Sequence, residues 1–223
     1  MILLLLILCI LPVVLSLDAF EIAQETSRDY RLSATRRFLM SFCFSFFTFI
    51  IPVICSVLFR FLFRGLHILD IILPASVINL LVPLAVLLFF IFTGGKKIIF
   101  GYIEYSGKSS PDTESAEKNE DVPLLLLFMQ AFASSSDMFG VGLLALLADV
   151  NTSLMSILKS IGITSDYLFV VLAAGITAFL TFLFSLVGSL LHINERKADS
   201  PQGITGIIGG TVTILAGILL VFM

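Results

Sequence analysis

The segment SLDAFEIA at residues 16–23 recurs in the second half of this 223-residue chain as SSDMFGVG at residues 135–142. Each copy places an aspartate, Asp18 or Asp137, inside a long hydrophobic segment. A carboxylate in the middle of a membrane-spanning helix costs about 2.5–3.5 kcal/mol on insertion scales, so such residues usually serve a function. Two aspartates in matched contexts therefore predict one site built from two related halves.

The composition is that of an integral membrane protein. Hydrophobic residues make up 58% of the chain, charged residues 13%, and the mean hydropathy is +1.10. A soluble domain of this length could not bury so much apolar surface, so we expect the lipid bilayer to be its solvent and nucleic acid to be no partner. Cys9, Cys43 and Cys55 all lie in apolar segments, where buried free thiols are expected rather than disulfides or a zinc site.

Six apolar stretches are long enough to cross a bilayer, and their richness in Leu and Phe predicts helices. They are Ile2–Ala23, Phe38–Phe63, Pro74–Phe100, Pro123–Leu147, Tyr167–Leu191 and Ile204–Met223. No basic residue precedes the first stretch, and it continues past Asp18, so we expect a spanning helix there rather than a cleaved signal peptide. The predicted fold class is an all-α integral membrane protein with six transmembrane helices.

The basic residues predict the orientation. Of the 13 Lys and Arg residues, ten lie in the first, third and fifth connectors, which places these connectors in the cytoplasm and both termini on the non-cytoplasmic side. Each half has an odd number of helices, so the two halves are inverted. We therefore divide the chain into a first three-helix repeat (1–104), an acidic cytoplasmic linker (105–122) and a second three-helix repeat (123–223).

A second repeated element supports two inverted repeats. A glycine pair, Gly94-Gly95 or Gly209-Gly210, follows the aspartate by 76 residues in the first half and by 72 in the second. Inverted repeats with a substrate site at their interface are a recurring plan of secondary transporters. We expect these glycines, with Gly206, to allow close helix packing. Lys96 and Lys97, directly after the first pair, are expected to mark the inner membrane interface.

The chemistry of the repeated motif indicates a hard cation. Aspartate oxygens suit Mn²⁺, Mg²⁺ or Ca²⁺, and no Cys or His lies near either motif. At helical spacing, Glu21 and Glu25 share a face with Asp18, and Glu25 is expected to be interfacial. Carboxylates that exchange a metal for protons would also provide proton coupling. The predicted metal ligands are Asp18, Asp137, Glu21, Ser16 and Ser135.

The chain resembles the MntP-type manganese efflux pumps, relatives of the LysE exporter group. The resemblance rests on residues 16–20 and 49–52, on GGKKII at residues 94–99, on SSDM at residues 135–138, and on GIIGG at residues 206–210. It implies a six-helix exporter in which Asp18 and Asp137 bind the ion, and it implies Mn²⁺ as the transported substrate. The chain departs from the family at Glu21, where a small or apolar residue is usual.

Other functions remain open at the level of sequence. Calcium, magnesium or a cationic amino acid are alternative substrates, although an amino acid needs a basic partner for its carboxylate and no mid-helix Arg or Lys is expected. An intramembrane aspartyl hydrolase also uses two aspartates, but no Gly-Asp or Tyr-Asp dipeptide is present. A non-transporting membrane scaffold is the third alternative. We expect no enzymatic activity and no resident cofactor.

Overall fold

In the computed structural model, every regular element of the described residues is helical. The structure describes residues 11–30, 32–68, 75–105, 122–143, 156, 159, 162, 165–191 and 202–222. The elements are the α-helices α2 (Leu11–Asp29), α3 (Ala34–Ile68), α4 (Ala75–Tyr105), α5 (Leu124–Ser134), α8 (Asp166–Leu191) and α9 (Gln202–Phe222), and the 3₁₀ helix η2 (Ser135–Met138). The all-helical part of the prediction is therefore confirmed.

Each of the six predicted stretches overlaps a described helix. Among the described residues, four segments are long and apolar enough to cross a membrane: Ala34–Leu62, Leu80–Ile103, Leu124–Leu143 and Tyr167–Leu191. Helix α9 contains a shorter apolar segment, and α2 carries several charged residues after Asp18. The chain is thus consistent with a multi-pass membrane protein. The predicted start of the first helix with Cys9, most of the acidic linker, and residues 144–147 lie outside the described residues.

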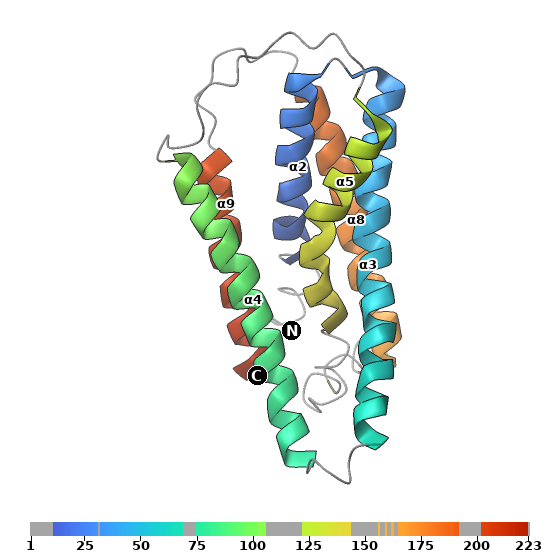
Figure 1. Ribbon diagram of the computed structural model, residues 1–223, viewed down its shortest axis with the longest axis vertical. Helices are drawn as coiled ribbons and strands as arrows, with labels where there is room; N and C mark the ends of the chain where they lie inside the picture. The colour runs from blue at the N-terminus through green and yellow to red at the C-terminus, as the bar shows by residue number, and fades with distance from the viewer. Residues whose placement is uncertain are drawn as a thin grey trace.

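The helices form two groups (Figure 1). Helix α4 packs along α9, and this pair lies beside α2, α3, α5 and α8. Within the larger group, α2 and α3 both pack on α8, while α5 and η2 pack on α3. Helix α9 also contacts α2, which joins the two groups. Lys97 is therefore carried by a helix of one group, and the two aspartates are carried by elements of the other group.

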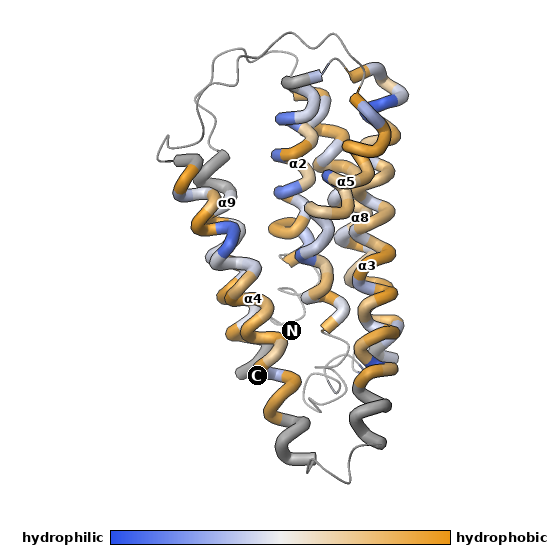
Figure 2. Tube along the Cα trace, in the orientation of Figure 1, coloured by the Kyte–Doolittle hydropathy of each residue, from blue (hydrophilic) through white to orange (hydrophobic). Residues whose placement is uncertain are grey.

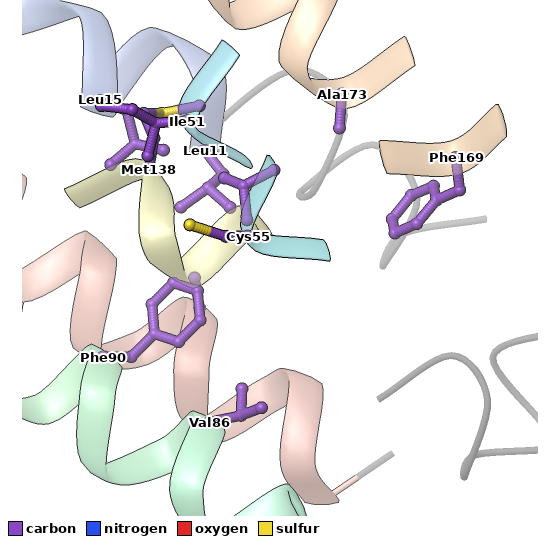
Figure 3. Close-up of a cluster of buried hydrophobic side chains, with 11 residues drawn as sticks. Leu11, Leu15, Ile51, Cys55, Val86, Phe90, Met138, Phe169 and Ala173 are labelled. Atoms are coloured by element: carbon purple, nitrogen blue, oxygen red, sulfur yellow. The ribbon is translucent and has the colours of Figure 1, made fainter. Parts of the chain in front are cut away.

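Two apolar clusters hold the helices together. The first cluster contains Leu11, Leu15, Ile51, Cys55, Val86, Phe90, Met138, Val141, Phe169, Ala173 and Ala216. In Figure 3 the ring of Phe90 on α4 is directed toward Cys55 on α3, so this cluster connects both groups of helices. The second cluster contains Ala19, Ala23, Leu32, Met40, Cys43, Phe44, Val122, Leu127 and Ala131. Cys43 and Cys55 are buried free thiols, as predicted.

The outer surface is strongly hydrophobic. Phe38, Phe42 and Phe46 are exposed at successive turns of α3, and α4 exposes Leu80, Leu84, Leu88 and Phe92. Figure 2 shows that hydrophobic residues dominate the helices, whereas hydrophilic residues occur in short stretches of α2 and α4. Exposed apolar surface of this extent is unfavourable in water and favourable against lipid. The distribution supports a membrane environment.

Glycines allow the close contact between α4 and α9. A Cβ atom on Gly94 would lie 2.5 Å from the carbonyl oxygen of Gly210, and a Cβ atom on Gly210 would collide with the carbonyl oxygen of Gly94. Gly206 makes a similar approach to Gly101, where a Cβ atom would lie 3.2 Å from the Gly101 Cα. The predicted packing role is confirmed for Gly94, Gly206 and Gly210. A Cβ atom on Gly95 would meet no atom within 4 Å.

Substitution of Gly94 by alanine should weaken the α4–α9 contact, because the added methyl group meets the backbone of Gly210. Overpacking of this kind costs about 1–3 kcal/mol, so the midpoint of thermal unfolding in detergent should fall. Gly95→Ala is the matched control, since its side chain enters open space and alanine favours the helix. Equal unfolding midpoints for the two variants would contradict this account of the crossing.

Candidate functional site

Three charged side chains from three elements meet inside the protein. The ammonium Nζ of Lys97 on α4 lies 2.7 Å from Oδ2 of Asp18 on α2 and 2.9 Å from Oδ2 of Asp137 on η2. The side chain of Lys97 is only 10% exposed, and those of Asp18 and Asp137 are 29% and 15% exposed. The two aspartates of the repeated motif therefore share one cationic partner.

The position of Lys97 departs from what the sequence led us to expect. Lys96 is exposed, but Lys97 points inward, because successive residues of a helix project about 100° apart. The prediction that both lysines mark the membrane interface did not include this inward contact of Lys97, and the depth of the two lysines in the membrane stays a prediction. The expectation that no mid-helix Lys or Arg is present is wrong, since Lys97 lies within the apolar segment Leu80–Ile103. The sequence signal that could have indicated a role for Lys97 is its position directly after the repeated glycine pair Gly94-Gly95.

The apolar clusters and the glycine crossing determine where the ion pairs lie along the helix axes. Along α2, Asp18 lies between Leu15 of the first cluster and Ala19 of the second. Along the fourth predicted helix, Asp137 directly precedes Met138 of the first cluster. On α4, Lys97 lies three residues after Gly94, where the crossing with α9 sets the rotation of the helix. The packing of the three elements therefore brings these three side chains to the same height along the bundle.

The backbone differs between the two motif copies. Asp18 lies in the continuous α-helix α2, whereas Asp137 lies in η2, which follows α5 directly. Helical hydrogen bonding resumes at Phe139. A 3₁₀ segment inside a helix is tighter than the α-helix, and such segments often mark a functional hinge. The second aspartate is therefore held by a local change of helix type that the first lacks.

The motif serines make equivalent hydrogen bonds. Ser16 Oγ lies 3.1 Å from Thr181 Oγ1 on α8, and Ser135 Oγ lies 3.2 Å from Thr48 Oγ1 on α3. Each serine precedes its aspartate by two residues and pairs with a threonine of the other half. Ser16 Oγ also donates to the carbonyl oxygen of Pro12. These bonds position both motif segments, and direct metal ligation by either serine stays a prediction.

The remaining predicted side chains lie on the same helices. Glu21 is partly exposed and Glu25 is exposed. Thr26 Oγ1 on α2 donates to Gln130 Oε1 on α5 at 3.3 Å, which joins the two motif helices. Within the described part of the chain, no three His, Cys, Asp or Glu side chains gather closely enough to hold a metal ion. Metal ligation by Asp18, Asp137 and Glu21 therefore stays a prediction.

The arrangement resembles a cation site in its charge and its chemistry. Two carboxylates face one ammonium, which leaves one excess negative charge when both carboxylates are ionised.

Comparisons with protein-family models, with curated proteins and with solved structures gave no match.

The serine–threonine pairs can be tested by a double-mutant cycle on Ser16→Ala and Thr181→Val. Hydrogen bonds between helices of membrane proteins contribute about 0.6 kcal/mol on average, so each single variant should lower the free energy of unfolding modestly. The double variant should cost less than the sum of the two, because both changes remove one bond.

Thr211→Val is the matched control for this cycle. The exposed Thr211 hydroxyl bonds only the Ile207 carbonyl of its own helix among the bonds described, so its loss should leave the unfolding equilibrium nearly unchanged. Strict additivity of Ser16→Ala and Thr181→Val would show that the pair does not join the halves.

Proposed function

We propose that the chain is a secondary transporter that exports a divalent metal cation, with Mn²⁺ as its substrate, through a site formed by Asp18 and Asp137. The observation that carries the proposal is the convergence of these two carboxylates on one cationic group, Lys97 Nζ. Carboxylates that already share a lysine ammonium are placed to share a metal ion. The preference for a hard cation follows from the oxygen ligands, and manganese follows from the family resemblance.

Six spans in two inverted repeats are part of this proposal. Exchange of the two halves relates α2 to α5 with η2, α3 to α8, and α4 to α9. The Ser16–Thr181 and Thr48–Ser135 bonds correspond under this exchange, and so do the two sides of the glycine crossing. The packing of α2 on α8 likewise corresponds to that of α5 on α3. These matches support a substrate site on the pseudo-two-fold axis.

Charge balance explains why a divalent ion suits the site. Two ionised carboxylates offset the charge of one divalent cation, which reduces the cost of moving it through a medium of low dielectric constant. Backbone carbonyls, water, and the hydroxyls of Ser16 and Ser135 would complete the coordination. Alternating access would expose Asp18 and Asp137 to the two sides of the membrane in turn, with both termini on the non-cytoplasmic side. Proton exchange at the carboxylates would provide coupling.

Asp18→Asn and Asp137→Asn should each reduce Mn²⁺ efflux to the background of a manganese-sensitive host. Either change removes a hard carboxylate ligand, while the other aspartate still pairs with Lys97, so the variants should insert and fold. The measurement is growth and intracellular Mn²⁺ under manganese challenge at matched expression. Parallel challenges with Ca²⁺, Co²⁺ and Zn²⁺ define the selectivity.

Glu25→Gln is the control, because it removes an exposed carboxylate from the same helix as Asp18. It should retain efflux. Normal manganese efflux by either aspartate variant would contradict the proposed site. Absence of protection by the wild-type chain against every metal, with the protein inserted in the membrane, would contradict metal export and favour a scaffold.

A cationic amino acid is a second candidate substrate, and the observation that favours it is Lys97. A free amino acid needs a basic partner for its carboxylate, and the buried ammonium between Asp18 and Asp137 supplies one. Export of labelled arginine or lysine from loaded vesicles distinguishes the candidates. Amino-acid export that depends on all three side chains would replace the metal in this proposal.

A further inference from the structure

The Lys97 side chain connects the two groups of helices. Lys97 belongs to α4, which packs chiefly along α9, whereas its partners lie on α2 and η2 in the larger group. Its ion pairs therefore fasten the α4–α9 pair at the level of both aspartates. The glycine crossing keeps α4 against α9, so a displacement of α4 would carry α9 with it.

The other half offers no second ammonium at the equivalent position. The crossing of Gly94 with Gly210 also places Ile98 against Gly210 and Ile214 against Gly94, which equates Lys97 with Thr213. Thr213 Oγ1 donates to the Gly209 carbonyl of its own helix at 2.7 Å. One lysine consequently serves two aspartates that come from opposite halves of the chain.

The ammonium and a metal ion would occupy the same place. Lys97 Nζ contacts an oxygen of each carboxylate at 2.7 and 2.9 Å, which is the arrangement that a bridging cation would adopt. Oxygen atoms coordinate hard divalent cations at roughly 2.0–2.6 Å, so the two positions overlap. The charges of ammonium and metal also repel each other. Binding of the metal between the carboxylates therefore requires Lys97 to leave.

We propose that the Lys97 ammonium is a tethered competitor of the cation substrate, which must displace it from Asp18 and Asp137 and thereby unfastens the α4–α9 pair. This inference rests on the proposed function. In the substrate-free protein, Lys97 offsets one of the two carboxylate charges and adds to the apolar contacts that hold the two helix groups together. When the ion departs, Lys97 returns between the aspartates and prevents immediate rebinding. Substrate occupancy and helix position are thus linked through one side chain.

Equilibrium binding of Mn²⁺ to the purified full chain in nanodiscs tests the competition. Lys97→Gln removes the tethered cation, so the apparent dissociation constant should fall. If the form with Lys97 displaced is about one tenth of the wild-type population, the fall is about tenfold. Lys96→Gln is the matched control, since it removes the same charge from the adjacent, exposed position, and it should bind as the wild type does. Asp18→Asn identifies binding at the proposed site.

A second measurement uses the wild-type protein and avoids any folding defect of Lys97→Gln. Acylation of lysines by a water-soluble reagent, followed by mass spectrometry, reports the protection of each amine. Lys97 should react slowly without metal and roughly tenfold faster when Mn²⁺ saturates the aspartates, because displacement releases the amine from its partners. Lys96 should react at the same rate in both conditions and serves as an internal control.

The outcomes separate this inference from the proposed function. Tighter binding by Lys97→Gln together with metal-induced reactivity of Lys97 supports the tethered competitor. Wild-type binding that depends on Asp18, combined with unchanged or weaker binding by Lys97→Gln or continued protection of Lys97, overturns the competitor and leaves metal transport standing. Failure of the wild type to bind Mn²⁺, Ca²⁺, Co²⁺ or Zn²⁺ overturns the proposed function and, with it, this inference.

Discussion

The contact of Lys97 with Asp18 and Asp137 is the interaction on which the interior of this protein depends. Two like charges at about 4 Å repel by about 4 kcal/mol at an effective dielectric constant of 20, so neighbouring buried carboxylates need a cation between them. The structure supplies that cation from a third helix. Because each ion is costly to bury alone, loss of Lys97 would leave both carboxylates without a cation, whereas loss of one aspartate leaves the other paired with Lys97. The balance of charge at this site therefore depends on how α2, α4 and η2 pack together.

Neighbouring contacts keep the three charged side chains in position. The serine–threonine bonds fix the motif segments two residues before each aspartate, and the glycine crossing fixes the rotation of α4. The 3₁₀ segment at Asp137 gives one motif a different backbone from the other. In the proposed cation site, the two carboxylates therefore come from segments that differ in backbone conformation, which is compatible with the proposed directional transport.

Much of the fold could be predicted from the sequence because lipid-facing helices leave a strong signal of length and hydropathy. The helices could be predicted in this way, whereas the paired aspartates and the glycine contacts at Gly94 and Gly210 were indicated by the repeated motifs. The inward direction of Lys97 was not, since it depends on the rotation of α4 at its crossing with α9. Thr48 and Thr181 were missed for the same reason: a threonine within an apolar helix does not disclose its partner.

An experimental structure with Mn²⁺ provides the most direct test of the central claim, that Asp18 and Asp137 form a single cation site. Anomalous diffraction at the manganese absorption edge locates the ion independently of any mutation. We expect one peak between the two carboxylates, with the Lys97 ammonium moved away from both. A manganese peak elsewhere in the protein, or none between these carboxylates at saturating Mn²⁺ while Lys97 still bridges them, would contradict it.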